Sequence, residues 1–413
     1  MLPHTEPATD RGRPVDLRIV ALLAAGGVAL AYPFYLSLMF RSANWILDTH
    51  GRPSVSGFLV FWETGRAVLR GAAASAYDPR ILHAAEVAAA GHEFTRHMSW
   101  QYPPLFFFVA AGLALLPYVP AFLFWIASTL AVYGLVVWRI AGSRLALVLA
   151  CAAPAVFINA IGGQNGPLTA ALIGTVLLNL EKRPVASGIA LGLLTYRPQF
   201  GLLFPLVLAA GGYWRAFFAA AATAVLGILA CWMAFGADAL GAFLHFLPKA
   251  SNALLVNGDN GFNNLQSVYG VARWLGMGAT GGWIVQGSAI LWTVVALVWL
   301  WRRNVPFEIK AAALATATLL ATPYVYIYDF TTLTVTFAFL YRQRRFDSLE
   351  MAGIVAANLC VGAFLFFPTP IGLLAIAIVL GLMVRRVVQA DKILPAASEC
   401  NARPLPLAPL ALG

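Results

Sequence analysis

Charged residues are scarce in this chain of 413 residues: Asp, Glu, Lys and Arg make up 11% of it, against 61% hydrophobic residues. A soluble domain carries about 25% charged residues, so the scarcity excludes a water-soluble fold. The apolar residues recur in blocks of roughly twenty, the length that crosses a hydrocarbon core of about 30 Å. The composition therefore predicts an all-α integral membrane protein with many spans, surrounded by membrane lipids.

Sites for metals and nucleotides are also lacking. The four cysteines are isolated from one another, which indicates neither a disulfide framework nor a zinc site. His83, His92 and His97 do not have the spacing of metal ligands. Sequences of the GxSxG, HExxH, P-loop and GxGxxG types do not occur in a suitable context. We therefore predict no cofactor and no metal ligands, and leave open whether a divalent metal takes part.

Positive charge is in excess, with a net charge of +10, but it is dispersed. The Lys and Arg residues lie in short loops between apolar blocks and form no continuous basic surface, which argues against nucleic acid as a partner. Cytoplasmic loops of membrane proteins retain Lys and Arg, so we place these clusters in the cytoplasm. The clusters are Arg11, Arg13 and Arg18; Arg139 and Arg144; Lys182 and Arg183; Arg215; Arg302 and Arg303; Arg342, Arg344 and Arg345; and Arg385 and Arg386.

This orientation predicts about twelve spans within a single membrane domain, 17–388, and cytoplasmic tails at 1–16 and 389–413. The second tail is expected to be poorly ordered from about residue 391. Two large external loops are expected at 40–102 and 236–282. The block Pro103–Pro117 is short and bordered by prolines, which favours a re-entrant or interfacial helix. The predicted spans are 17–39, 121–138, 145–160, 167–180, 185–196, 200–211, 214–235, 283–300, 308–322, 327–340, 349–367 and 371–384.

Nearly all of the unusual polar motifs fall on the external side of this threading, which predicts one site there. Arg197 lies between two short apolar blocks and precedes a helix-breaking proline. A charge in the bilayer costs roughly 2.5–3.5 kcal/mol, so this arginine either binds an anion such as phosphate or extends to lipid headgroups.

Other polar residues leave two interpretations open. Gln164 and Asn165, flanked by glycines, either bind sugar hydroxyls or form a plain turn. Tyr328 and Asp329 either belong to an interfacial aromatic belt or bind Arg197 or a substrate hydroxyl. In the first loop, Phe58 to Leu69 and Ile81 to Ala90 carry apolar residues at helical spacing, which predicts helices on the membrane surface.

Four short motifs stand out: Gln101-Tyr102-Pro103-Pro104-Leu105, Gly163-Gln164-Asn165, Tyr196-Arg197-Pro198-Gln199 and the first-loop segment Phe58 to Pro79. Together they resemble glycosyltransferase family 87, over about residues 45 to 340. The resemblance implies a GT-C-like polytopic bundle in a bacterial plasma membrane. It further implies a polyprenyl-phosphate sugar donor and transfer of a hexosyl (mannosyl) or pentosyl unit to a lipid-linked or glycan acceptor at the extracytoplasmic face.

The resemblance also implies roles. Chemistry of this kind is inverting: a carboxylate accepts the proton of the acceptor hydroxyl and cationic groups stabilise the departing phosphate, the latter role falling to Arg197. The family pattern has an aspartate immediately before the Phe of the first loop, where this chain has Gly57. Asp48 or Glu63 is then the candidate base, with Asp329 as a third possibility. The candidate substrate-binding residues are Arg66, Tyr102, Gln164, Asn165, Arg197, Gln199, Tyr328 and Asp329.

Two other functions remain open. Gly57 favours a catalytically silent relative that binds a lipid-phosphate sugar. The short broken helices at 185–211 favour a transporter or flippase of lipid-linked sugars, although such proteins often have a corresponding pair in the other half of the chain, and no second pair is detectable here.

Overall fold

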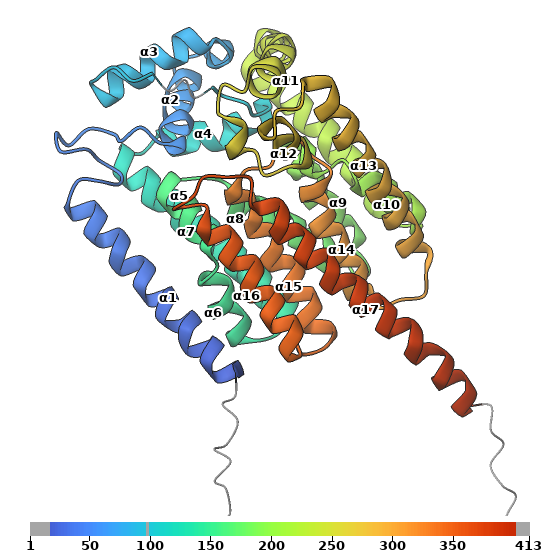
Figure 1. Cartoon of the computed structure of the whole chain (residues 1–413). Helices are drawn as coiled ribbons and strands as arrows, with labels where there is room; N and C mark the ends of the chain where they lie inside the picture. Colours follow the sequence, from blue (N-terminus) through green and yellow to red (C-terminus); the bar gives the residue numbers. More distant parts are fainter. Residues whose placement is uncertain (1–16, 96–98, 402–413) are drawn as a thin grey trace, which may run out of the picture.

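The computed structural model describes residues 17–95 and 99–401; the predicted N-terminal tail, His97 and residues 402–413 lie outside them. Every element in the described part is a helix (Figure 1). A single antiparallel bridge, between Leu47 and Pro53, is the one strand-like pairing there. The prediction of an all-α fold is confirmed.

Within the described residues, five helices are long and apolar enough to cross a membrane by length and composition. A sixth span results if α6 and α7, which are bent by 54° at a break before Pro154, count as one. Several other apolar helices are shorter than a bilayer requires, so the structure supports a membrane protein with several spans and leaves the number twelve a prediction. The five are α1 (Leu17–Arg41), α5 (Tyr118–Ala141), α11 (Trp214–Ser251), α13 (Ala279–Arg302) and α17 (Gly372–Asn401).

Shorter helices make up much of the rest of the bundle, and three of them, α6, α8 and α15, pack on α5. Thr316 of α14 and Thr336 of α15 share a hydrogen bond of 2.9 Å, and Tyr133 of α5 donates to Thr334 at 2.7 Å. Internal bonds of this kind satisfy hydroxyl groups that lipid cannot. These helices are α6 (Arg144–Cys151), α7 (Pro154–Gly162), α8 (Gly166–Asn179), α9 (Pro184–Leu193), α10 (Phe204–Ala210), α14 (Phe307–Leu320), α15 (Thr332–Gln343) and α16 (Ser348–Ala363).

Helices α9 and α11 approach one another closely at two glycines. A Cβ atom on Gly188 would lie 2.5 Å from both the Ala216 carbonyl oxygen and the Ala219 Cβ, and Gly192 faces Thr223 in the same way. Small residues four apart let membrane helices pack backbone against backbone. This contact fixes α9, and α9 ends just before Arg197.

The first loop forms a helical cap at one end of the bundle. Figure 1 shows α2 (Gly57–Leu69), α3 (Pro79–Ala90) and α4 (Phe107–Ala114) together at the end opposite to the start of α1 and the end of α17. The two helices predicted in the first loop are therefore present, and their position on the membrane surface stays a prediction. Helix α4 is short, as the prolines of its block predict, and it packs mainly on α2, where Ala110 lies against Gly65. Its membrane depth remains a prediction.

Two segments contain more helix than we expected. Helix α11 continues past residue 235 to Ser251, with a break at Gly236 (φ 78°, ψ 171°). It is followed by η5 (Asn252–Asn257), η6 (Phe262–Asn264) and α12 (Val268–Trp274), so the segment 236–282 is largely helical; its external position stays a prediction. Helix α17 runs to Asn401, past residue 389 where the predicted C-terminal tail begins; the poor order of that tail stays a prediction.

Candidate functional site

A buried ion pair joins two segments that are 132 residues apart in the chain. Arg197 lies between the short helices η3 (Leu194–Tyr196) and η4 (Pro198–Phe200), where Pro198 prevents one continuous helix. Asp329 lies in η7 (Ile327–Thr331). Arg197 Nη2 donates to Asp329 Oδ2 at 3.2 Å, and Nη1 contacts Oδ1. The side chains are only 4% and 0% exposed, so each charge depends on the other.

Further hydrogen bonds tie this pair to the turn that begins α8. Arg197 Nη1 also donates to Asn165 Oδ1 at 3.2 Å, and the Tyr326 N–H donates to Asp329 Oδ2 at 3.0 Å. Three segments, at the end of α9, the start of α8 and the start of η7, therefore meet at one guanidinium group. The structure thus brings together the predicted residues Arg197, Asn165 and Asp329.

Asn159 is a residue of this site that the sequence analysis did not identify. Its Nδ2 donates to the Tyr328 carbonyl oxygen at 2.8 Å and to Thr331 Oγ1 at 2.9 Å, while its Oδ1 accepts from the Gly166 N–H at 2.8 Å. It thereby holds the α8 turn against η7. The available signal was a lone amide inside an apolar block, since such residues normally have polar partners.

Aromatic rings surround the guanidinium. Arg197 Cζ lies 4.5 Å from the centre of the Phe200 ring and 5.7 Å from that of Tyr328, distances at which a cation is attracted to a ring face. Tyr102 stacks on Tyr196 at 6.4 Å, and the Tyr196 hydroxyl lies 2.6 Å from Thr169 Oγ1. The predicted binding residues with half-buried side chains at or beside this site are Tyr102, Gln164, Gln199 and Tyr328.

The start of α2 also reaches the site, at Gly57. The Gln164 amide fills the space that a side chain at position 57 would need. A Cβ atom on Gly163 would lie 2.5 Å from the Phe58 Cβ, so the α2 start and the α8 turn are in close contact. Position 57 is therefore in contact with Gln164, the chain neighbour of Asn165.

The candidate bases Asp48 and Glu63 make other contacts. Asp48 Oδ1 accepts the backbone N–H groups of Arg52 and His50 at 2.9 and 2.8 Å, which lowers the pKa of Asp48. Glu63 Oε1 accepts from Arg66 Nη1 at 2.8 Å, and lies six residues, about 9 Å of helix, beyond Gly57. No hydrogen bond within the described residues joins Asp48, Glu63 or Arg66 to Arg197, and their roles stay predictions.

A second buried carboxyl group, Glu86, lies in the cap between α3 and α2. It is 0% exposed, and neither of its oxygens has a hydrogen-bond partner among the described residues. Burial, and then the negative charge of Glu63, raise the pKa of Glu86 to about 8. His83 Nδ1 lies 3.9 Å away. Glu86 is therefore protonated at neutral pH.

We expect the Glu86 carboxyl to make the cap sensitive to alkali. Between its ordinary pKa of 4.5 and the raised value of about 8, the folded state binds more protons than the unfolded state, so stability falls as pH rises through this window and levels off above it. Glu86→Gln stays neutral, so its melting temperature in detergent should fall less between pH 6 and 9 than that of the wild type. The exposed Glu93→Gln serves as the control; equal pH dependence in all three proteins would contradict the assignment.

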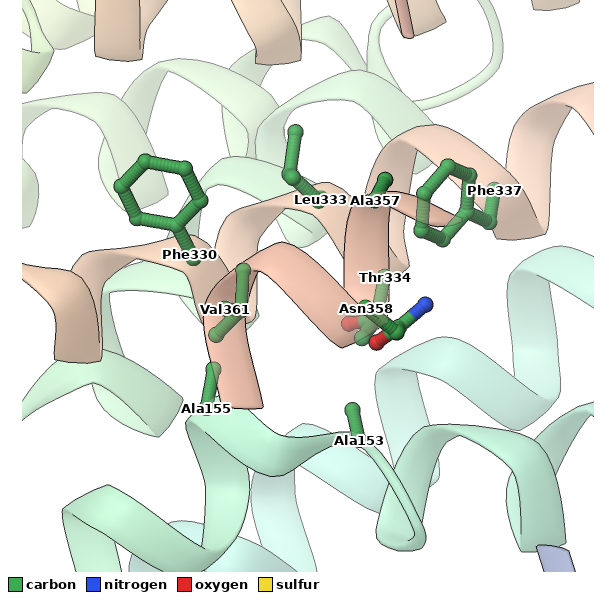
Figure 2. Close-up of a pocket in the computed structure, with 9 residues that line it drawn as sticks. All are labelled: Ala153, Ala155, Phe330, Leu333, Thr334, Phe337, Ala357, Asn358 and Val361. Carbon is green, nitrogen blue, oxygen red and sulfur yellow. The ribbon is translucent and has the colours of Figure 1, made fainter. Parts of the chain in front are cut away.

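The cavity in Figure 2 lies apart from the guanidinium, between α7, α15 and α16. Its volume is about 10 Å³, which suits one water molecule, and Figure 2 shows mainly apolar side chains around it, such as Phe330 and Val361. It is too small for a sugar. Across residues 17–95 and 99–401, no three His, Cys, Asp or Glu side chains are grouped as metal ligands.

The family model described as glycosyltransferase family 87 matches residues 100–323, which is more than half of the chain. The chain belongs to glycosyltransferase family 87. The predicted resemblance is thus confirmed, and this family member is a membrane glycosyltransferase that takes a sugar donor and an acceptor. Comparison with curated proteins and with solved structures found no match. The matched range contains Tyr102, Asn165 and Arg197 and excludes Gly57 and Asp329.

Proposed function

We propose that this family 87 enzyme transfers a sugar from a polyprenyl-phosphate donor to a lipid-linked or glycan acceptor at the external membrane face. The observation that carries the proposal is the buried Arg197, held by Asp329 and Asn165 at the helical break after α9. A buried guanidinium group suits a phosphate because it offers paired N–H donors and a permanent charge. The phosphate of a lipid-linked donor reaches such a site from the membrane itself.

The proposed reaction exchanges one bond at the anomeric carbon. The acceptor hydroxyl oxygen forms a bond to that carbon, and the bond from the carbon to the phosphate oxygen breaks. The polyprenyl phosphate leaves with the electron pair, and its growing negative charge is stabilised by Arg197. The hydroxyl proton passes to a carboxylate, for which Asp48, Glu63 and Asp329 are the candidates. Attack opposite to the leaving group gives an inverting enzyme.

The orientation of the chain belongs to the same proposal. Helix α8 begins beside Arg197 and ends close to Lys182 and Arg183, and α9 runs from these basic residues back to Arg197. Basic residues also end α5 and α13, at Arg139 and Arg302. Because basic loops remain in the cytoplasm, the end that holds Arg197 is external, in a plasma membrane crossed twelve times with both termini inside.

The decisive experiment is transfer of radiolabelled sugar by the purified protein in proteoliposomes. Polyprenyl-phosphomannose and a pentosyl equivalent are offered with lipid-linked acceptors, with and without EDTA, and labelled product is expected without an added cofactor. Release of free polyprenyl phosphate in equal amount confirms a transfer. Movement of an intact labelled donor across the bilayer without product would instead favour a flippase and contradict the proposal.

A silent lipid-phosphate-sugar binder is the second candidate, favoured by Gly57 and the Gln164 amide that fills its space. It predicts binding of the labelled donor without product from any acceptor. The same proteoliposomes distinguish the two candidates, since bound and transferred label separate by extraction.

A further inference from the structure

A hydrogen-bond donor at the site is buried without an acceptor. Among the described residues, Arg197 Nε has no hydrogen-bond partner, and Asn165 Nδ2 has none at full hydrogen-bond geometry, although the Tyr102 hydroxyl lies beside this amide. The Arg197 side chain is 4% exposed and Asn165 is 0% exposed. A buried unpaired donor costs about 1–3 kcal/mol, so the unpaired Arg197 Nε requires an explanation.

The geometry of the guanidinium group supplies one. A guanidinium has five N–H bonds. The end of the group, Nη1 and Nη2, donates to the two oxygens of Asp329, and Nη1 also donates to Asn165. The N–H of Nε and the second N–H of Nη2 lie along the other edge. This edge is one on which arginine binds two oxygens of a phosphate or a carboxylate at once.

We infer that Asp329 is a positioning residue, which holds Arg197 by one edge so that the Nε–Nη2 edge binds the phosphate of the donor. The inference rests on the proposed function, since it assigns the phosphate atom by atom within that site. The donor then binds without breaking the ion pair. A lysine cannot replace Arg197 here, because an ammonium group has no second edge.

The matched control is a second buried pair far along the chain. Glu350 accepts from Arg386 Nε at 2.8 Å and from Nη2 at 3.0 Å, and both side chains are 1% exposed. This pair joins the start of α16 to α17, and no hydrogen bond among the described residues connects it to those around Arg197. Glu350→Gln and Asp329→Asn thus make the same chemical change in two buried pairs.

The test measures kcat and donor KM for transfer, and the binding of unreactive polyprenyl phosphate to the protein in nanodiscs. For Asp329→Asn we expect donor KM and the polyprenyl phosphate Kd to rise together by about 10- to 100-fold, with kcat changed less than tenfold. Asn165→Ala, which keeps the ion pair, should raise both by a smaller factor. Glu350→Gln should lower the melting temperature and leave both constants unchanged.

Two results would overturn the inference. If Asp329→Asn lowers kcat at least a hundredfold at unchanged KM and removes the acidic limb of the pH profile, then Asp329 is the proton acceptor. If Asp329→Asn and Asn165→Ala leave KM, kcat and Kd as in the wild type and lower only the melting temperature, the pair is a structural tie. Failure of the proposed function can be told apart from failure of this inference. A wild type that binds polyprenyl phosphate but transfers no sugar would contradict the proposed transfer and would still support phosphate binding at the Nε–Nη2 edge.

Discussion

Arg197→Lys should lower sugar transfer by at least about a hundredfold, the usual loss when a donor to a developing oxyanion is removed. Lysine keeps the positive charge beside Asp329, so the buried carboxylate retains a counter-ion, whereas alanine would leave it unpaired and destabilise the fold by about 3–5 kcal/mol. The loss with lysine therefore reports on the paired N–H donors and not on folding. Initial rates with saturating acceptor and a melting curve for each variant supply the measurement.

Arg273→Lys is the control for this change. Arg273 also lies over an aromatic ring, Phe262, at 4.4 Å, and donates to the carbonyl oxygens of Met277 and Val256. It is half-buried and has no predicted role in binding, so its replacement should leave the rate within about twofold of the wild type, as changes away from a functional feature usually do. Equal rates for Arg197→Lys and the wild type would remove Arg197 from the phosphate site.

Gly57→Asp should raise transfer by about a hundredfold, because a positioned general base contributes about 10²–10⁴. Position 57 opens α2, where a carboxylate is favoured by the helix dipole. The atoms in the way belong to the end of the flexible Gln164 side chain, so the new side chain displaces an amide and not backbone. The carboxylate would then lie beside Gln164 and Asn165, near the proposed phosphate.

Gly57→Asn is the control that distinguishes the effect of a new general base from the effect of displacing the Gln164 side chain. It has almost the same shape as aspartate but accepts no proton at neutral pH, so only the aspartate variant should gain activity. A gain in both would assign the effect to the movement of Gln164. No gain in either variant would favour Asp48 or Glu63 as the base. Asp48→Asn and Glu63→Gln then test these two residues.

Some residues of the site could be identified from the sequence, and others could not. Arg197 was identifiable because a charge before a proline between apolar blocks is unusual. For Asp329, the sequence left open an interfacial aromatic belt, pairing with Arg197 and a bond to a substrate hydroxyl. Asn159 was missed because a single amide in a span gives a weak signal. The tight fit of Gly57 against Gln164 could not be foreseen, since it depends on how α2 lies on the α8 turn.

The sequence by itself determined the membrane class, the helical character, the helices of the first loop and the family, because hydrophobic content, apolar periodicity and short motifs are local properties. Only the tertiary structure decided that Arg197 pairs with Asp329, that Glu86 is buried beside Glu63, and that α11 continues beyond residue 235. Such features depend on which distant segments exclude water from one another. Burial and partner choice follow from the packing of the whole chain, and no window of sequence contains them.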